Sequence, residues 1–274
     1  MEFSMFGPLK VSDGDRILGP RDLGGVKPRQ VLEMLLLARG HLVSTDVIAT
    51  ALWAEGEEPR NVAATLNTYV CVLRHSIFTD QSRARRVIMT GPGSYRIALD
   101  EVSVDLDRFD ELVLRAERAP RAERLELLGA AVAMARGPVL EHARYDDWVQ
   151  EDRLVYEDRV TRAHLDLALD SLAEGERAAC LRHAEIALGR DRYSEEAYRL
   201  VMLANHGLGR HDAVRRAAER CRTVLDQELG VACGPETERL LAAIEARAAE
   251  ADILRAYYPS AGVGTPVERE LSVA

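Results

Sequence analysis

An apolar stripe at helical spacing, followed by a short hairpin pattern, restricts the fold more than any other stretch of this sequence. Between residues 59 and 99, apolar residues first recur every three or four positions, which predicts a helix with one buried face. The residues on that face are Leu66, Val70, Leu73 and Ile77. Two β-rich runs, RVIMT and SYRIAL, then flank Gly91-Pro92-Gly93, which predicts a hairpin after a basic connector.

The charge of this stretch differs in sign from the charge of the chain. Residues 59–99 carry six arginines and one acid, a net charge of +5, whereas the whole chain has a net charge of −9. A basic helix and hairpin suit duplex DNA, because the major groove admits a helix and the phosphates attract cations. The alternative is an ordinary amphipathic helix and hairpin whose arginine-rich face is only solvated.

A small sheet and two further helices are predicted ahead of this stretch. Met1 to Leu18 alternates in hydropathy and contains turn signals, which is typical of short strands. A first helix is expected with Pro28 in its opening turn and Gly40 beyond its end, and a second with Ser44 as N-cap. The buried side of the second helix is expected to hold Val47, Ile48, Leu52 and Trp53. A sheet, three helices and a hairpin in this order predict a winged helix-turn-helix domain over residues 1–100.

The remainder of the chain carries an internal repeat. Ser103 to Phe109 is interpreted as a short linker, and helical patterns follow. Residues 167–188 align with residues 202–222 at an offset of 34, the period of tetratricopeptide helix pairs. The matched pairs are Leu169 with Leu203, Gly175 with Gly209, Ala179 with Ala213, and Ala184 with Ala218. The chain is therefore predicted to be mainly α with a small β component, with a tetratricopeptide-like domain over 104–251 and a loose tail over 252–274. Stacked helix pairs suit partner binding, and the alternative is a bundle that supports the first domain or dimerises.

Other classes of protein are disfavoured by composition. No apolar run approaches the length of a membrane span, and the N-terminus lacks the pattern of a signal peptide, so we expect a cytoplasmic protein with no membrane contact. The four cysteines lack zinc-site spacing, which predicts reduced thiols and no metal. No catalytic arrangement or nucleotide fingerprint stands out, so neither an enzyme nor a cofactor is expected.

Several stretches in order resemble the Streptomyces antibiotic regulatory protein family, from residue 1 to about residue 247. They are KPRQVLEMLLLARGHLVSTDVIATALW, ATLNTYVCVLRH, GPGSYRI, VDLDRFDELV, RGPVLEH and DQELGVACGPETERL. The resemblance implies a response-regulator-type winged helix joined to a bacterial transcriptional activation domain. It also implies activation of a linked antibiotic biosynthesis cluster, binding to direct repeats near promoters as a homodimer or in tandem, and contact with RNA polymerase. The chain is similar to the short form of the family, without a nucleotide-binding extension or a receiver domain.

The resemblance also implies which residues meet double-stranded DNA. The family's recognition helix falls by position on Arg60 to Ile77. Base edges or the adjoining backbone are assigned to Arg60, Asn61, Thr65, Asn67 and Thr68. Phosphates are assigned to Tyr69, Arg74 and His75, although Tyr69 is equally compatible with packing against the first helix. Family members usually carry a polar or basic residue where Val72 stands and often a serine where Cys71 stands, so base readout at that step differs or is absent.

Three further cations complete the candidate interface. Arg96 on the hairpin is expected to reach a phosphate or the minor groove. Lys27 and Arg29 at the start of the first helix either contact phosphates or are solvated surface. The competing hypothesis is a protein-interaction adaptor whose winged helix has lost DNA binding, and duplex binding that falls steeply with salt discriminates the two.

Overall fold

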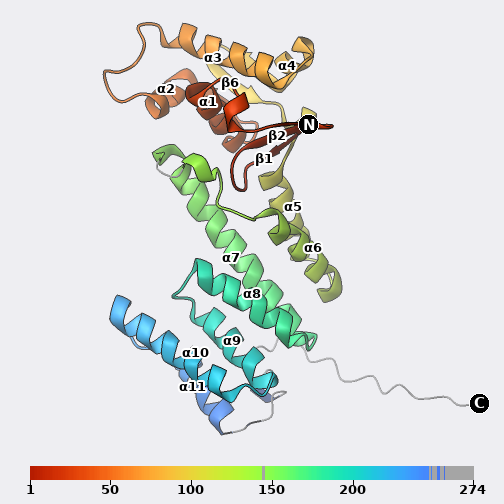
Figure 1. The fold of residues 1–274 in the computed structure, drawn as a ribbon, viewed down its shortest axis with the longest axis vertical. Coiled ribbons are helices and arrows are strands. Elements are labelled where there is room, and N and C mark those ends of the chain that lie inside the picture. The colour runs from red at the N-terminus through yellow and green to blue at the C-terminus, as the bar shows by residue number, and fades with distance from the viewer. Residues whose placement is uncertain (144–145, 247, 249–251, 254–255, 257–274) are drawn as a thin grey trace, which may run out of the picture. The chain divides into compact units, whose positions relative to one another are not determined.

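The computed structural model describes residues 1–274 apart from 144–145, 247, 249–251, 254–255 and 257–274. The chain divides into two compact units. Unit 1 comprises Met1–Arg115 and Ala130–Asp158, and unit 2 comprises Ala116–Gly129 and Arg159–Ala274. The mainly helical architecture with small sheets confirms the predicted fold class (Figure 1). Most of the predicted tail over 252–274 lies outside the described residues. No described helix is both long enough and apolar enough to cross a bilayer.

The first sheet of unit 1 has the strand order β3-β2-β1-β7. Its strands are β1 (Glu2–Ser4), β2 (Lys10–Asp13), β3 (Arg16–Leu18) and β7 (Ser103–Val104). β7 runs parallel to β1, with Phe3 opposite Val104 and both side chains buried. The interpretation of Ser103 to Phe109 as a linker is therefore wrong. The stretch forms the edge strand β7 and the start of a helix, because Val104 and Phe109 are buried in the core of unit 1.

A buried carboxylate fixes the start of α5 (Asp105–Ala116) against this sheet. Asp105 is 5% exposed and accepts hydrogen bonds from the backbone N–H groups of Met5 and Phe6 at 2.8 and 3.0 Å. Burial raises the pKa of Asp105, and these N–H donors oppose that shift. The later segment Ala130–Asp158 joins the same unit, since Leu140 donates its N–H to the Met5 carbonyl at 2.8 Å.

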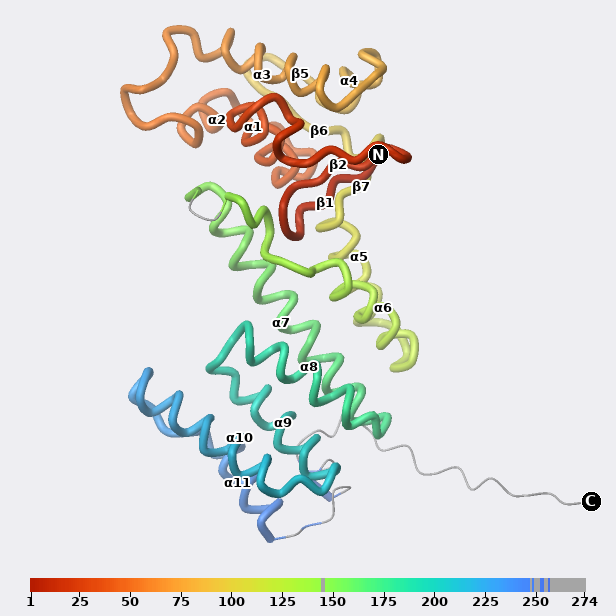
Figure 2. The backbone as a smooth tube through the Cα atoms, viewed as in Figure 1, coloured from red at the N-terminus to blue at the C-terminus, as the bar shows by residue number. Residues whose placement is uncertain are grey.

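Three helices and a second sheet complete the winged helix-turn-helix. The helices are α1 (Val26–Leu37), α2 (Thr45–Leu52) and α3 (Val62–Ile77), and the sheet joins β4 (Val43–Ser44), β6 (Ser94–Ile97) and β5 (Ile88–Gly91) in the order β4-β6-β5. In Figure 2 these helices and strands occupy the part of the tube that is coloured from red to yellow. The Ser44 hydroxyl caps α2 by accepting from Val47 N–H at 3.2 Å, as predicted. The four predicted apolar positions of α3 are all buried.

Two local predictions in this region are wrong. Val47 is 59% exposed, because its place in the first turn of α2 turns it outward. The basic connector after α3 is a helix, α4 (Gln81–Val87), which begins where the Asp80 carboxylate accepts from Ser82 N–H at 2.8 Å. Its apolar positions, Ala84 and Val87, are buried.

The turn before α1 touches α3 through a residue that has no side chain. Gly24 has φ +78°, and a Cβ placed there would overlap Cγ1 of Val72. Val72, which is half-buried, thus lies against the turn that precedes α1. Valine is stiff about χ1, so it cannot swing away from an added atom.

We predict that Gly24→Ala destabilises the chain by about 2–4 kcal/mol, from the left-handed backbone and the overlap with Val72 together. Gly14→Ala is the matched control, because Gly14 has φ +59° and open space around its Cα. Urea denaturation measures both, and Val72→Ala should recover part of the loss in the Gly24→Ala background only. Equal losses at Gly14 and Gly24 would contradict the contact.

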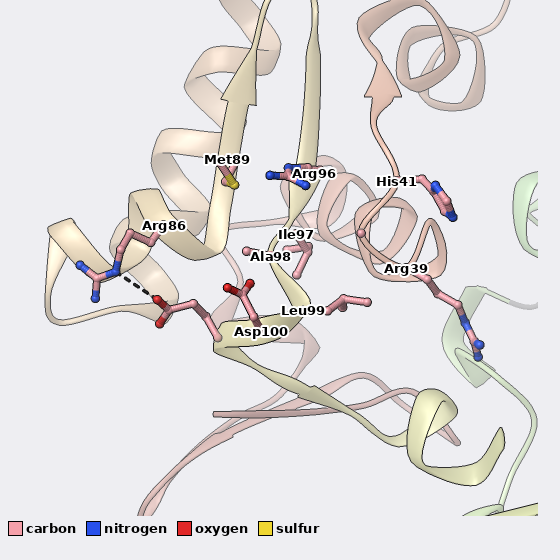
Figure 3. A pocket seen from close by; sticks show the side chains of 11 residues that line it. Arg39, His41, Arg86, Met89, Arg96, Ile97, Ala98, Leu99 and Asp100 are labelled. Carbon is pink, nitrogen blue, oxygen red and sulfur yellow. Dashed lines mark hydrogen bonds and ion pairs between the residues drawn. The ribbon is translucent and has the colours of Figure 1, made fainter. Parts of the chain in front are cut away.

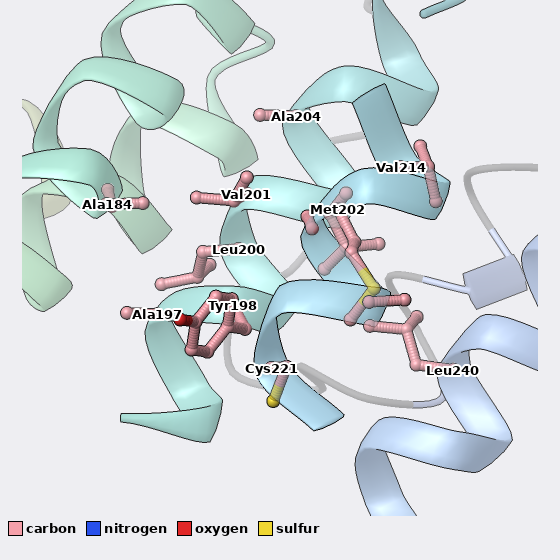
Figure 4. Close-up of a cluster of buried hydrophobic side chains, with 14 of the residues drawn as sticks. Ala184, Ala197, Tyr198, Leu200, Val201, Met202, Ala204, Val214, Cys221 and Leu240 are labelled. Atoms are coloured by element: carbon pink, nitrogen blue, oxygen red, sulfur yellow. The ribbon is translucent and has the colours of Figure 1, made fainter. Parts of the chain in front are cut away.

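Unit 2 is built around one helix that is buried on most sides. α9 (Glu195–Gly207) packs against α8 (Arg177–Arg190), α10 (His211–Val224) and α11 (Pro235–Glu245). Tyr198, Leu200 and Met202 of α9 lie in the resulting core, together with Cys221 and Leu240 (Figure 4). The described residues also include two longer helices, α6 (Arg121–Met134) and α7 (Gln150–Ala173).

The 34-residue repeat is confirmed by its turns. Gly175, between α7 and α8, and Gly209, between α9 and α10, both have positive φ. Glu176 N–H donates to Ser171 O at 2.8 Å, and Arg210 N–H donates to Asn205 O at 2.8 Å, again 34 residues on. Both turns are the glycine-containing helix end in which a following N–H reaches back to an unsatisfied carbonyl.

A pair of histidines lies within unit 2. The Nδ1 atoms of His164 and His183 are 3.1 Å apart, so one ring donates to the other. Burial, with the neighbouring His183 and Arg190, lowers the pKa of His164 to about 4. The unfolded chain therefore takes up a proton at this position at a pH where the folded chain does not.

We predict that His164 makes the chain less stable as the pH falls from about 6.5 to about 4. The unfolded state binds more protons in that window, so the loss reaches about 3 kcal/mol at roughly 1.4 kcal/mol per pKa unit. Thermal unfolding of the parent and of His164→Gln across this range measures the effect. Identical pH profiles for the two proteins would show that His164 does not supply it.

Candidate nucleic-acid interface

One flank of α3 is exposed and carries no acid. The exposed residues are Arg60 and Asn61 at its start and Ala63, Ala64, Asn67, Thr68, Cys71 and His75 along its length. Asn61 is the N-cap, since its Oδ1 accepts from Ala64 N–H at 3.0 Å. The small side chains at 63 and 64 leave the helix backbone accessible to a bulky ligand. The flank therefore combines a cation, amides, a hydroxyl and a histidine on one surface.

The hydrogen bonds within α3 decide what its polar groups can offer. The hydroxyls of Thr65 and Thr68 donate to the carbonyls of Asn61 and Ala64, both at 3.0 Å. Their outward faces therefore present a methyl group and an oxygen acceptor. His75 donates from Nδ1 to Cys71 O at 2.8 Å, which leaves Nε2 to face solvent.

Arg74 fastens the hairpin to α3. Its guanidinium donates to the carbonyl of Ile88 and, at 2.9 Å, to Oγ1 of Thr90, both on β5. Burial lowers the pKa of Arg74, with a smaller contribution from Arg85. The structure therefore gives Arg74 a positioning contact with the wing, whereas the sequence assigned it to a phosphate.

Tyr95 orients one of the exposed amides. Its hydroxyl donates to Oδ1 of Asn67 at 2.8 Å, and burial raises the pKa of Tyr95, which keeps the donor protonated. With its oxygen engaged, Asn67 presents its NH₂ group outward as a donor. Sequence reasoning missed Tyr95, although its place on a strand beside a recognition helix is a signal that could have found it.

Arg96 lies on the opposite face of the wing from α3. Its partner across the hairpin is Met89, whereas Tyr95 and its partner Thr90 face α3, as expected when side chains alternate along a strand. Arg96 and Met89 line a hollow of about 560 Å³ together with Arg39, His41 and Arg86. Figure 3 shows Arg96 and Met89 on neighbouring strands. Arg96 and the α3 flank are thus not brought together on one surface.

Lys27 and Arg29 of α1 and Tyr69 of α3 each have a partner within unit 1. Lys27 donates to the carbonyl of Leu52 and lies 5.2 Å from the centre of the Trp53 ring. Tyr69 stacks on Trp53 with ring centres 6.3 Å apart, so packing at the end of α2 accounts for it. Arg29 contacts the fully buried Glu33, with Nε 3.1 Å from Oε1. Each of these side chains is therefore engaged within unit 1.

The charge near α3 is less one-sided than the sequence suggests. Arg83 pairs with Asp13 at 3.1 Å and Arg86 with Glu101 at 3.2 Å, so two of the six arginines meet acids from outside the stretch. Three exposed glutamates also precede α3 directly, namely Glu55, Glu57 and Glu58. They fall just before Pro59, where the counted stretch begins, and so were missed. The flank carries its positive charge mainly at Arg60, beside an acidic loop.

The second half of the chain matches a known family of domains. Residues 104–245 match the family model of the bacterial transcriptional activator domain. The chain is 31% identical to the transcriptional regulatory protein MoaR1 of Mycobacterium tuberculosis over 88% of this chain and 78% of that protein. It is 28% identical to the regulatory protein DnrI of Streptomyces peucetius over 89% of this chain and 92% of that protein.

A solved structure extends the comparison to three dimensions. Mycobacterium tuberculosis EmbR, in complex with a low affinity phosphopeptide, superposes with a TM-score of 0.81. The match has 26% identity and covers 95% of this chain and 68% of that one. The chain belongs to the Streptomyces antibiotic regulatory protein family. Membership places it among transcriptional regulators and not among enzymes.

We predict that Arg74→Lys loosens the wing of this family member. A single ammonium cannot reproduce the paired donation of a guanidinium to Ile88 and Thr90, and the loss should be about 1–2 kcal/mol. Hydrogen–deuterium exchange should rise in residues 88–97, and the exposed Arg85→Lys on α4 is the matched control. Unchanged protection of the hairpin in Arg74→Lys would rule out this fastening role.

Proposed function

We propose that this protein is a DNA-binding transcriptional activator that inserts the exposed flank of α3 into the major groove. The observation that carries the proposal is the acid-free flank itself, which is exposed in unit 1 and held in a fixed orientation beside the wing. A helix of this kind fits the width of the major groove and meets base edges with its first turns. Membership in a family of transcriptional regulators supports the same function.

Base readout falls to the middle of the flank in this proposal. The outward NH₂ group of Asn67 suits the acceptors on purine edges, and the methyl group of Thr68 suits the methyl group of thymine. Arg60 and His75, near the two ends of α3, reach phosphates on either side of the groove. Cys71 offers little to a base edge, which supports altered readout at that step.

The wing and α1 play secondary parts in the proposal. Arg96, on the far face of the hairpin, reaches a phosphate only where the duplex bends towards it. Lys27 and Arg29 are engaged with Trp53 and Glu33 within unit 1, Tyr69 packs α3 against Trp53, and Arg74 holds the wing to α3. DNA binding is thus assigned to fewer side chains than the sequence suggested.

The activating role rests on the second half of the chain. We infer that the tetratricopeptide-like helices over 104–251 contact RNA polymerase while winged helices, over 1–100, occupy direct repeats in tandem or as a homodimer. The regulated genes are proposed to form an antibiotic or secondary-metabolite cluster, supported by the family to which the chain belongs. Footprinting on promoters next to the gene for this protein tests the pathway, because protected direct repeats are expected there.

The central prediction is that Arg60→Ala weakens duplex binding and lowers the salt dependence of the affinity by about one counterion. Fluorescence anisotropy with a labelled mixed-sequence duplex, titrated at several salt concentrations, measures both quantities. Arg182→Ala, at an exposed position of α8, makes the same change in net charge and should leave both unchanged. Glu57→Gln should strengthen binding, since it removes a negative charge beside the start of α3.

Two results would oppose this function. An Arg60→Ala protein with the parent's affinity and salt slope would remove Arg60 from the interface. A parent protein without salt-dependent duplex binding would instead favour the protein-interaction adaptor. The exposed glutamates next to α3 are the observation that favours that role, because they repel phosphates.

A further inference from the structure

Three side chains with metal-binding atoms meet where α9, α10 and α11 converge in unit 2. Glu195 lies in the first turn of α9, Cys221 in the last turn of α10, and Cys233 two residues before α11. Their carboxylate and sulfur atoms all lie within 4.8 Å of one another. The two sulfur atoms are 3.4 Å apart. The cysteines are twelve positions apart and no recognised motif joins them, so the sequence alone predicted only packed thiols.

The three side chains differ in burial and in the elements that carry them. Cys221 is fully buried on a helix, whereas Cys233 is partly exposed in the irregular segment that leads to α11. The Glu195 carboxylate is already aimed at this point, because it accepts from Gly234 N–H at 2.9 Å and from the Thr237 hydroxyl at 2.5 Å. One buried sulfur on a helix, one partly exposed sulfur and an oriented carboxylate are therefore available at one point.

We propose that Cys221, Cys233 and Glu195 bind a soft divalent metal ion, for which Zn²⁺ is the best-suited ion. Zn²⁺ accepts thiolate and carboxylate ligands together, and three protein ligands leave a fourth position for water. Cadmium, which is softer still, fits the same donor set.

The sulfur–sulfur distance favours a metal over a disulfide bond. Two thiolates on a tetrahedral Zn²⁺, each about 2.3 Å from the ion, are about 3.8 Å apart. The 3.4 Å separation has to widen by only a few tenths of an ångström to reach that value. A disulfide bond, at about 2.05 Å, needs the sulfur atoms to approach by more than 1 Å.

Nearby charges also suit a bound cation with anionic ligands. Burial raises the pKa of Cys221 and of Cys233, so binding must release a proton from each thiol. Two thiolates, a carboxylate and a divalent ion sum to a charge of −1. Arg199, near Cys221, and Arg222, near Cys233, act in the opposite direction and lower the pKa of each thiol, so they also offset that charge.

A bound ion would join three helices at one point. Leu240, Leu241 and Ile244 of α11 enter the core that Cys221 also belongs to, and the segment before α11 is held there by Glu195. The ion would fasten this segment to α9 and α10. Metal binding is therefore expected to stabilise the C-terminal helices of unit 2.

Cadmium titration of the full chain tests the site. The protein is reduced, freed of metal with a chelator, and titrated with Cd²⁺ while the thiolate-to-metal charge-transfer absorption is recorded. We expect saturation at one ion per chain. Cys233→Ser should lose more than about 100-fold in affinity, because loss of a residue that only hydrogen-bonds to a ligand costs about 10- to 100-fold. Glu195→Gln, which retains an acceptor for Gly234, should weaken binding by at least about tenfold.

Controls separate this site from the other thiols. Cys71→Ser, at the exposed cysteine of α3, should bind Cd²⁺ like the parent. Bound Zn²⁺ should raise the melting temperature of the parent and of Cys71→Ser but not of Cys233→Ser. Alkylation followed by mass spectrometry, which needs no variant, should find Cys233 protected by Zn²⁺ in the parent.

Three results would overturn the proposal. The first is the absence of a charge-transfer band at one equivalent of Cd²⁺. The second is a band of full strength in Cys233→Ser, which would place the ion elsewhere. The third is conversion of the two thiols to a Cys221–Cys233 disulfide with no ion bound and no protection of Cys233 by Zn²⁺.

Discussion

The guanidinium of Arg74 is the contact on which the candidate interface depends. Arg74 extends from α3, and its guanidinium donates to Ile88 O and Thr90 Oγ1 on β5. These hydrogen bonds fix the position of the wing relative to the helix. The Tyr95 hydroxyl adds a second connection, and this one ends on an exposed amide, Asn67. Two hydrogen-bonding side chains thereby convert an amphipathic helix and a separate hairpin into one rigid surface. A surface prepared in this way loses little conformational entropy when a partner binds.

The region after the wing is as closely tied to unit 1 as the wing itself. β7 adds a parallel strand to the N-terminal sheet, and Asp105 captures two backbone N–H groups at the end of β1. The winged helix and the beginning of the activator domain therefore share a sheet and a buried carboxylate. We propose that domains over 1–100 and 104–251 describe the division of function, whereas the compact units are divided differently.

The sequence predicted the features that depend on residues close together in the chain. It did not predict contacts between residues far apart in the chain. The apolar stripe of α3, the Ser44 cap and the 34-residue repeat each follow from local periodicity or a local hydrogen bond, and all three are present. The sequence could not show that Arg83 meets Asp13 or that Arg29 meets a buried Glu33, since those partners are chosen by the fold. The net charge of +5 was therefore a poor guide to the charge that the α3 flank presents. The meeting of Cys221 and Cys233 with Glu195 was hidden for the same reason.

Site-specific photo-crosslinking shows whether the exposed flank of α3 faces DNA. A benzophenone amino acid placed at Thr68, on that flank, is compared with the same group at Glu185, an exposed position of α8. We expect a crosslink to duplex DNA from position 68, lost as salt rises, and none from position 185. Equal crosslinking from both positions, or none from position 68 while the complex forms, would contradict it.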